Sequence, residues 1–348
     1  MTSAIDLKQA IAQLIDGRDL DATEMTAVMR AIMTGGATAA QIAGFLVALR
    51  LKGETVAEIA AAAAVMRELA SGVDIGDLTN AVDIVGTGGD ASGTFNVSTA
   101  SMFVAAAAGC HVAKHGNRSV SSKSGAADVL EAAGIKLGLT PAQVAQCVRE
   151  VGVGFMFAPA HHGAMKHAIG PRRELGVRTI FNILGPLTNP AGVKRQVLGV
   201  FAESLLDPLA EVLRSLGSEH VMVVHAEDGL DEISIASPTD VAELKDGAIR
   251  RYRISPADFG LESTSLDAIR VDGPEQSLQL VRAALAGEPG AARDIVLLNA
   301  GAAIYVAGVA ESLATGIDAA RQAIERGAAL ERLERLATLT ASFASATP

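Results

Sequence analysis

The chain has 348 residues, of which 49% are hydrophobic and 20% are charged, as expected for a globular protein that buries a sizeable core. Its formal net charge of −10 at pH 7 argues against a general nucleic-acid-binding surface, because affinity for a phosphate backbone requires an excess of lysine and arginine. The two cysteines, Cys110 and Cys147, lie far apart in apolar surroundings, which indicates reduced core residues and a cytoplasmic protein.

Neither the start of the chain nor its most apolar stretch predicts contact with a membrane. The first residues, MTSAIDLKQAIAQLIDG, lack a basic region followed by a continuous apolar run, so we expect no signal peptide. The uncharged stretch from Ile295 to Ala310 is shorter than the about 20 residues that a spanning helix requires. We therefore interpret it as a buried core segment.

The first part of the chain reads as a small helical bundle. A helix is expected around Ile5 to Ile15, and apolar residues recur at helical spacing further on. Three more helices are predicted by capping boxes, in which Asp21 pairs with Glu24, Thr38 with Gln41, and Thr55 with Glu58. Short helices with short connections favour a separate N-terminal domain over residues 1–72.

From residue 81 the pattern changes to alternating strands and helices. Strands are expected at Ala81 to Val85, Cys110 to Lys114, Gly154 to Ala158, Gln196 to Phe201 and Val221 to His225. Helices are expected at Thr99 to Ala108, Ser124 to Ala133, after Thr140 and at Leu205 to Leu216. This rhythm predicts a larger α/β domain over residues 73–348 with a mainly parallel central sheet. Helical segments near 161–187 interrupt it, and we expect them to pack with the N-terminal helices.

The first strand ends in a glycine-rich stretch, DIVGTGGDASGTFNVSTAS at residues 83–101, which is typical of a phosphate-binding loop. Gly88 to Gly93 has the spacing of a P-loop, but Thr94 follows where that loop requires a lysine. A dinucleotide fold would place an acidic residue about 20 positions further on, and no acid occurs from Ala91 through Ala127. Neither of these two phosphate folds therefore fits.

The second strand ends instead in a basic segment, Lys114-His115-Gly116-Asn117-Arg118, and Lys123 follows shortly after it. Short hydroxyl and amide side chains surround these cations, and two helix N-termini follow the two loops. A set of glycine turns and serine caps with nothing bound is the alternative. It does not account for the basic cluster at the end of a strand, so the segment predicts a second anionic group of the ligand.

A run of carboxylates, Glu227-Asp228-Gly229-Leu230-Asp231-Glu232, follows the last predicted strand. In an open parallel sheet this is the edge where ligands bind. Adjacent carboxylates without histidine or cysteine suit Mg²⁺, which is shared with substrate phosphates. A solvated acidic turn is the alternative for the run taken alone. The histidines lack the spacing of a zinc helix, and no nucleophile with its base can be singled out by spacing.

Taken together, these motifs resemble the anthranilate phosphoribosyltransferase family. That family transfers phosphoribose from phosphoribosyl pyrophosphate (PRPP) to the amine of anthranilate in tryptophan biosynthesis and releases pyrophosphate. The resemblance implies a small helical domain plus a larger α/β domain, a homodimer through the helices, and no membrane or nucleic-acid partner. It extends in order over nearly the whole chain and is carried by GTGGD at 86–90, NVST at 96–99, KHGNRSVSSKSGAADVLEAAG at 114–134, RRELGVRTIFNILGPLTNP at 172–190 and GLDEIS at 229–234.

The resemblance also implies roles for individual residues. Mg²⁺ would be bound by Ser98, Asp231 and Glu232, and anthranilate would meet Gly86, Asn117, His162 and Arg172, with His115 beside its path. PRPP would be held by Gly86, Gly89, Asp90, Thr94, Asn96, Val97, Ser98 and Thr99 in the first loop, and by Lys114, His115, Gly116, Asn117, Arg118, Ser119, Val120, Ser121, Ser122 and Ala126 in the second. Lys114, Asn117 and Arg172 would act by positioning and electrostatics.

Two positions depart from the family's pattern. Gly163 stands where many relatives have proline, and Ala126 where some have serine, which removes one possible PRPP contact. The absence of an evident general base fits the reaction, because the amine of anthranilate is neutral at pH 7. A pyrimidine nucleoside phosphorylase-like enzyme and a non-catalytic relative that binds nucleic acid are the alternatives. The segment at 172–190 argues against the first alternative, and the net charge against the second.

Overall fold

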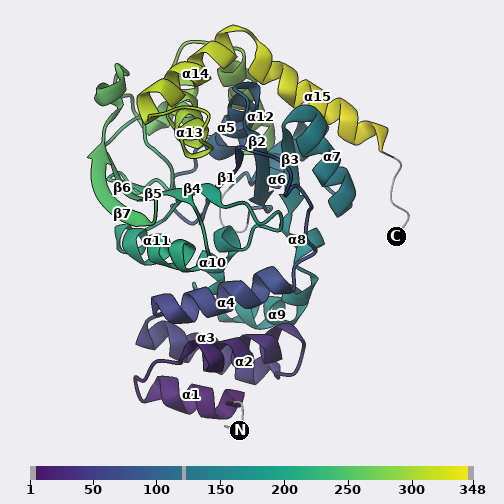
Figure 1. Cartoon of the computed structure of the whole chain (residues 1–348), viewed down its shortest axis with the longest axis vertical. Helices are drawn as coiled ribbons and strands as arrows, with labels where there is room; N and C mark the ends of the chain where they lie inside the picture. The colour runs from purple at the N-terminus through teal and green to yellow at the C-terminus, as the bar shows by residue number, and fades with distance from the viewer. Residues whose placement is uncertain (1–4, 120–122, 344–348) are drawn as a thin grey trace.

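The computed structural model describes residues 5–119 and 123–343. The chain begins with four helices, α1 (Leu7–Ile15), α2 (Ala22–Met33), α3 (Ala39–Lys52) and α4 (Val56–Glu68), which form the purple bundle in Figure 1. The capping boxes expected at the N-termini of α2, α3 and α4 are all present. Helix α9 (Lys166–Leu175), from much later in the chain, packs against α2 and α3.

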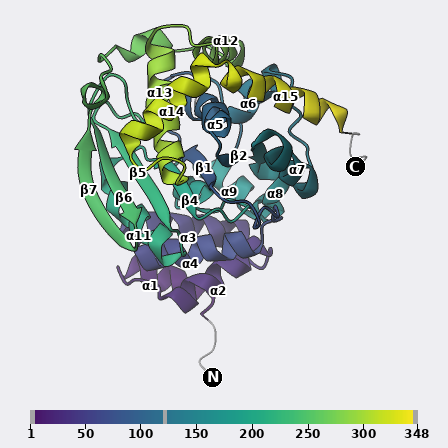
Figure 2. The same cartoon turned by 45° about the horizontal axis from the view of Figure 1, so that its top comes forward.

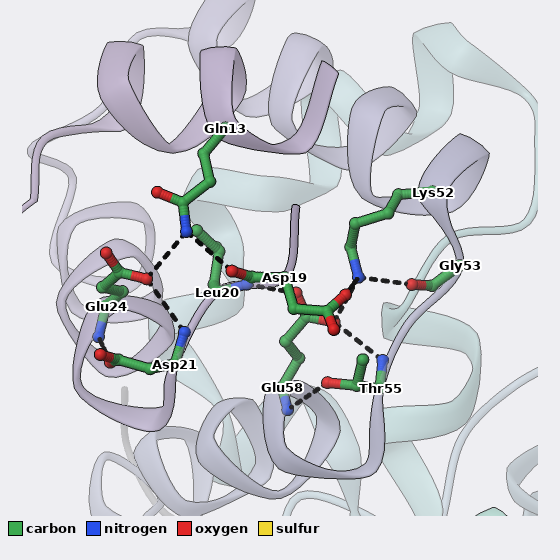
Figure 3. A network of polar contacts seen from close by, with 9 residues as sticks. All are labelled: Gln13, Asp19, Leu20, Asp21, Glu24, Lys52, Gly53, Thr55 and Glu58. Atoms are coloured by element: carbon green, nitrogen blue, oxygen red, sulfur yellow. Dashed lines mark hydrogen bonds and ion pairs between the residues drawn. The ribbon is translucent and has the colours of Figure 1, made fainter. Parts of the chain in front are cut away.

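A buried ion-pair network holds the bundle together (Figure 3). The Glu58 carboxylate is fully buried and accepts hydrogen bonds from the backbone N–H groups of Leu20 at 2.9 Å and Thr55 at 2.8 Å. The Lys52 ammonium group lies 2.9 Å from Glu58 and 2.6 Å from Asp19. One carboxylate therefore joins the loop before α2 to the loop between α3 and α4.

Replacing Glu58 by glutamine is expected to lower the free energy of unfolding by about 2 to 4 kcal/mol, because the buried Lys52 loses a charged partner. Chemical denaturation followed by circular dichroism measures this loss. The matched control is Glu68→Gln, which removes a half-exposed pair with Arg30 in the same bundle and should cost less than about 1 kcal/mol. Equal losses for the two variants would contradict a special role for the buried pair.

The larger part of the chain is built on a seven-stranded sheet in the order β3-β2-β1-β4-β5-β6-β7. The strands are β1 (Ala81–Gly86), β2 (His111–Gly116), β3 (Val153–Phe157), β4 (Arg195–Gly199), β5 (His220–Ala226), β6 (Thr239–Lys245) and β7 (Ala248–Ile254). The first five in chain order run parallel, and β6 and β7 form an antiparallel edge. The predicted helical domain and mainly parallel sheet are confirmed.

The sequence analysis did not identify the hairpin of β6 and β7. Its two-residue turn consists of Asp246 and Gly247, both with positive φ, which is the backbone conformation of a tight hairpin turn. An Asp-Gly pair between two runs of strand-forming residues could therefore have identified this hairpin from the sequence.

Helices cover both faces of the sheet (Figures 1 and 2). On one face α5, α7 and α13 contact the parallel strands, and on the other α11 packs between the sheet and α4. The bounds are α5 (Val97–Ala107), α6 (Ala126–Ala132), α7 (Pro141–Val151), α8 (Ala158–His161), α10 (Phe181–Leu184), α11 (Leu206–Ser215), α12 (Pro274–Leu285), α13 (Ala291–Val306), α14 (Leu313–Glu325) and α15 (Ala328–Ser342). Short 3₁₀ turns lie at Gly163–Met165, Gly185–Leu187, Glu203–Leu205, Pro256–Phe259 and Leu266–Ile269.

Helix α13 contains most of the apolar stretch predicted as a core segment. Its residues from Ile295 to Ile304 are buried, so that prediction is confirmed. In the part of the chain that the structure describes, no helix combines the length and apolar character needed to cross a membrane.

The strand order places a topological switch point between β1 and β4. From β1 the chain moves through β2 to β3 on one side, and β4 then pairs with the other side of β1. At such a point the connections after two neighbouring strands diverge and leave a crevice at their carboxyl ends. In this sheet Gly86 and Gly199 lie opposite each other at that edge.

Candidate functional site

Three predicted segments meet at the carboxyl edge of the parallel strands. The first loop, residues 86–96, connects β1 to α5, and the second loop, residues 117–125, connects β2 to α6. The acidic turn, residues 227–232, follows β5. Because these strands run parallel in one sheet, all three segments lie at the same edge and can contact a single ligand.

Glycine at two strand ends lets the acidic turn approach the first loop. A Cβ atom at Gly86 would lie 2.4 Å from Oδ2 of Asp231, and one at Gly199 would lie 1.5 Å from the carbonyl oxygen of Asp231. The backbone N–H of Gly88 donates to Oδ2 of Asp231 at 2.7 Å. The glycines at these ends therefore provide the space that brings a carboxylate against a phosphate-type loop.

Glu232 lies at the N-terminus of α5. Its Oε1 accepts a hydrogen bond from the backbone N–H of Ser98 at 2.9 Å, while its Oε2 is buried and has no hydrogen-bond partner among the described residues. The Lys114 ammonium group donates to the Ser98 hydroxyl at 3.1 Å and to the carbonyl oxygen of Ile84. A helix cap accounts for the position of Oε1 but not for that of Oε2.

The negative charge of Asp231 and Glu232 is not fully balanced by the positive charge near them. Burial and the nearby Asp90 raise the pKa of Asp231 to about 7. Burial and Asp231 raise the pKa of Glu232 well above its ordinary value. Burial lowers the pKa of Lys114, although Asp83, Glu232 and Asp231 oppose that shift. The site is arranged for additional positive charge between the two carboxylates.

The arrangement fits Mg²⁺ that shares its coordination with a ligand. Among the described residues, no group of three histidine, cysteine, aspartate or glutamate side chains could hold a metal ion alone. Mg²⁺ is commonly bound by one or two carboxylates together with substrate phosphates and waters. Asp231, Glu232 and the Ser98 hydroxyl form such an incomplete set at the edge of the first loop.

The other two acids of the predicted run point elsewhere. Glu227 lies 3.8 Å from Arg253 at the surface. Asp228 accepts hydrogen bonds from the backbone of Leu230 and from the Ser234 hydroxyl, so it closes the turn itself. Asp231 and Glu232 contact the first loop and the start of α5, whereas Glu227 and Asp228 make their contacts elsewhere.

The other predicted PRPP-binding residues of the first loop and of the start of α5 differ in how exposed their polar groups are. The side chain of Val97 is buried in the core, and the buried hydroxyl of Thr99 has no hydrogen-bond partner in the structure. The Thr94 hydroxyl lies 3.1 Å from that of Ser92. Gly89 has a φ of +80°, and its carbonyl oxygen accepts a hydrogen bond from Arg178.

The second loop is anchored by Asp128 of α6. Its Oδ2 accepts hydrogen bonds from the backbone N–H groups of Ser119 at 3.2 Å and Gly125 at 2.9 Å. Arg118 pairs with Asp128 at 2.9 Å and with Glu131, which turns it toward α6. The predicted ligand-binding residues Val120, Ser121 and Ser122 lie outside the described residues. Gly116 ends β2, Asn117 begins the loop, and Ala126 begins α6.

Two neutral histidines, His115 of β2 and His162 just after α8, lie side by side. The rings of His115 and His162 are 5.0 Å apart, and the Nδ1 atom of His115 lies 3.1 Å from the carbonyl oxygen of Gly185. Burial lowers the pKa of His115 to about 3 and that of His162 to about 4. The structure thus brings His162 to His115 at the end of β2, and neither ring carries a positive charge at neutral pH.

Because His115 and His162 are buried in their neutral form, we predict that the folded protein loses stability in mild acid. Unfolded histidines take up protons below about pH 6.5, whereas His115 and His162 stay neutral in the folded state until about pH 4 or lower. Unfolding therefore becomes easier as the pH falls from 6.5 to 5, by about 1 to 2 kcal/mol for each histidine. The measurement is denaturant unfolding of the wild-type protein and of His162→Gln at pH 7.5 and pH 5.

The variant is expected to be less stable than the wild-type protein at pH 7.5 and to reach or exceed its stability at pH 5, because glutamine takes up no proton. A difference in stability that stays constant between the two pH values would contradict the neutral, buried state of His162.

Arg172 is a partly buried cation that no carboxylate among the described residues neutralises. Its guanidinium lies 5.1 Å from the ring centre of Phe181, and burial lowers its pKa. Among the described residues it forms no ion pair with a carboxylate. The neighbouring Arg173 is exposed. A cation held in this way suits a ligand that carries a carboxylate.

Sequence reasoning did not single out Arg178 or Asp83. Arg178 stacks over Phe201 at 4.1 Å and binds the first loop through Gly89, so it links the segment after α9 to that loop. Asp83 of β1 is fully buried and accepts hydrogen bonds from Asn189 and from the backbone of His115. Arg178 lies inside the RRELGVRT motif, which was the available signal, and Asp83 is the polar residue of an otherwise apolar strand.

Comparison with known families assigns the two parts of the chain to one enzyme group. Residues 8–70 match the family described as "Glycosyl transferase family, helical bundle domain". Residues 78–330 match the family described as "Glycosyl transferase family, a/b domain". The second match alone covers more than half of the chain.

Two curated relatives are similar over nearly their full length. The anthranilate phosphoribosyltransferase of Thioalkalivibrio sulfidiphilus is 64% identical over 338 residues, which is 97% of this chain and 100% of the relative. The enzyme of the same name from Cellvibrio japonicus is 64% identical over 340 residues, which is 97% of this chain and 99% of the relative.

Solved structures are similar in fold over the same extent. The crystal structure of anthranilate phosphoribosyltransferase from Thermus thermophilus has a TM-score of 0.90 and 44% identity, and the match covers 96% of this chain and 99% of that one. The Saccharomyces cerevisiae enzyme in complex with PRPP and Mg has a TM-score of 0.87 and 27% identity, with 97% and 98% covered.

Proposed function

The chain belongs to the anthranilate phosphoribosyltransferase family, and on that premise we propose which of its residues hold each substrate. The reaction transfers 5-phosphoribose from PRPP to the amine of anthranilate, releases pyrophosphate and serves tryptophan biosynthesis. The chain is accordingly a pentosyltransferase. A nucleoside phosphorylase-like enzyme and a nucleic-acid-binding relative are not favoured, because the curated relatives at 58 to 64% identity share one activity.

PRPP is proposed to lie across the first and second loops, at the carboxyl edge of the parallel strands. The observation that carries this proposal is the carboxylate of Glu232: its Oε1 accepts from the backbone N–H of Ser98, and its buried Oε2 has no hydrogen-bond partner among the described residues. Ser98, Asp231 and Glu232 would hold Mg²⁺. When bound, that ion would stabilise the negative charge that develops on the departing pyrophosphate.

The residues of the chain act mainly by positioning. Lys114 adds a positive charge beneath the first loop, where its ammonium group donates to the Ser98 hydroxyl. Positive charge develops on the ribose ring as the pyrophosphate leaves, as in other glycosyl transfers. The neutral amine of anthranilate attacks without the help of a strong base.

Anthranilate is proposed to lie between the second loop and α9. The guanidinium of Arg172 would bind its carboxylate, and Asn117 and Gly86 would face the ring from the loops. His162 and His115, both neutral, would line the path without competing for the carboxylate. The Saccharomyces cerevisiae enzyme has been solved in complex with 4-fluoroanthranilate, at a TM-score of 0.87 and 26% identity, which supports an aromatic acid as the acceptor.

The experiment that tests this function follows the fluorescence of anthranilate. Purified protein supplied with PRPP and Mg²⁺ is expected to consume anthranilate, and removal of the metal with excess EDTA is expected to stop the reaction. Full turnover after metal removal would contradict the proposed magnesium site. Absence of turnover under every condition would contradict the activity itself.

We also propose that the active protein is a cytoplasmic homodimer. Large apolar side chains are exposed on the bundle, where Leu51 of α3 is 82% and Ile15 at the end of α1 is 72% exposed. Helices α1 and α3 pack together, so one further copy could cover both residues. The proposal of a reducing, cytoplasmic environment is supported by two cysteines that are both free and buried.

Light scattering at micromolar concentration is expected to give the mass of a dimer for the wild-type protein. Leu51→Asp is expected to give a monomer, because burying a charge in an apolar interface is costly. The control Val309→Asp changes an exposed apolar side chain just after α13, far from the bundle, and should stay dimeric. A monomeric wild-type protein would contradict this proposal.

We further propose that residues 1–72, together with segments near 161–187, form the small domain and that residues 73–348 form the large one. The shared core of α2, α3 and α9 supports this division.

A further inference from the structure

Asn96 begins α5, but its side chain does not cap that helix. Its Oδ1 accepts a hydrogen bond from the hydroxyl of Ser124 at 2.7 Å and another from the hydroxyl of Ser277 at 2.7 Å. Its Nδ2 donates to the carbonyl oxygen of Ser124 at 3.1 Å. The amide of Asn96 therefore joins the end of the first loop to the end of the second loop and to α12.

Ser277 completes this junction from a position far away in the sequence. Its side chain is fully buried in α12, and its hydroxyl both donates to Oδ1 of Asn96 and accepts from the backbone N–H of Asn96 at 3.1 Å. Helix α12 packs against α5 and α6, the two helices whose N-termini follow the loops. A buried hydroxyl that both donates and accepts a hydrogen bond fixes the orientation of its partner as well as its position.

The segment before α12 extends the same support along the first loop. The backbone N–H of Phe95 donates to Ile269 at 2.9 Å, and that of Val271 donates to Gly93 at 2.9 Å. Thr94 and Arg270 form an isolated antiparallel bridge between these two bonds. The first loop is thus held by a short two-stranded contact that ends at the junction of Asn96 with Ser277.

We propose that Ser277 is a positioning residue for PRPP, which acts through Asn96 to set the spacing between the two loops. This inference rests on the proposed function, in which both loops bind one PRPP molecule. A ligand that needs donors from two loops binds more tightly when their spacing is fixed beforehand, because less conformational freedom is lost on binding. Ser277 itself is buried behind Asn96 and is assigned no contact with the ligand.

The experiment compares Ser277→Ala with a matched control, Thr340→Val. Thr340 is buried in α15, and its hydroxyl accepts a backbone hydrogen bond from Lys136 at 3.2 Å, so both changes remove one buried hydroxyl that accepts from a backbone N–H. Ser277→Ala is expected to raise the KM for PRPP about tenfold, which corresponds to about 1.4 kcal/mol, while the KM for anthranilate stays within about twofold. Thr340→Val is expected to leave both KM values unchanged.

A double-variant cycle tests whether the effect passes through Asn96. Because Ser277 is argued to act through that residue, Ser277→Ala combined with Asn96→Ala should show the same KM for PRPP as Asn96→Ala alone. An unchanged KM for PRPP in Ser277→Ala would overturn the inference, and so would effects that multiply in the double variant. Failure of the proposed function is recognised separately, because the wild-type protein would then show no saturation with PRPP.

Discussion

The double variant Asp231→Asn with Glu232→Gln is expected to lower kcat/KM by about 100-fold or more and to leave the melting temperature unchanged or higher. The two carboxylates are buried close to Asp90, and Lys114 offers partly compensating charge. Removing their charge takes away mutual repulsion, so the fold loses little. The reaction, in contrast, loses the groups proposed to hold Mg²⁺. Steady-state kinetics over a range of Mg²⁺ concentrations, together with thermal unfolding, measures both effects.

Glu227→Gln is the matched control for the double variant. This residue lies in the same acidic turn but faces Arg253 at the surface, so its replacement is expected to change kcat/KM by less than about threefold. If the double variant instead kept its activity and melted well below the wild-type protein, the turn would be a structural feature and the magnesium site would have to be sought elsewhere.

Replacing Arg172 by alanine is expected to raise the KM for anthranilate about tenfold or more while the KM for PRPP stays near that of the wild-type enzyme. The partly buried guanidinium lies over the ring of Phe181 and has no carboxylate partner among the described residues, so an ionised ligand is its natural counter-charge. A charge-assisted contact of this kind contributes about 1.5 to 3 kcal/mol. Michaelis–Menten measurements with each substrate varied in turn give the two KM values.

Tyrosine and tryptophan side chains are poorly placed to take over this role. The chain has no tryptophan and two tyrosines, and Tyr252 and Tyr305 both lie near Glu243 of β6. A phenylalanine such as Phe181 can pack against the ring but offers no charge to its carboxylate, so we expect Arg172 to fix the orientation of anthranilate. Arg173→Ala is the control, since the neighbouring residue points about 100° around the helix and is exposed. Similar behaviour of the two variants, or weakened PRPP binding in Arg172→Ala, would contradict the proposed anthranilate end of the site.

Much of the fold could be predicted because local signals and the global architecture agree. Capping boxes at Asp21, Thr38, Thr55 and Thr140 identify four helices, and all four are present. The apolar runs that end in glycine at Gly86 and Gly116 become neighbouring strands β1 and β2. The rule that ligands bind at the carboxyl ends of parallel strands then brings the loops together without knowledge of any tertiary contact.

The parts that could not be predicted depend on contacts between distant segments. The direction of the Asp231 side chain is set by space left at Gly86 and Gly199, which no local pattern reveals. The junction of Asn96 with Ser277 joins residues 181 positions apart, and a serine inside an amphipathic helix carries no distinguishing signal. The separation of Asp228 from Asp231 likewise follows from the turn around Gly229, whose φ of +91° reverses the chain.

The most direct test of the account is a crystal structure of the protein with PRPP and Mn²⁺ in place of Mg²⁺. The anomalous signal of manganese locates the ion independently of the protein density. We predict a peak beside the carboxylates of Asp231 and Glu232, with the pyrophosphate of PRPP across the first loop and the N-terminus of α5. A manganese peak away from these two carboxylates, or PRPP bound away from the carboxyl edge of the sheet, would contradict the proposed site.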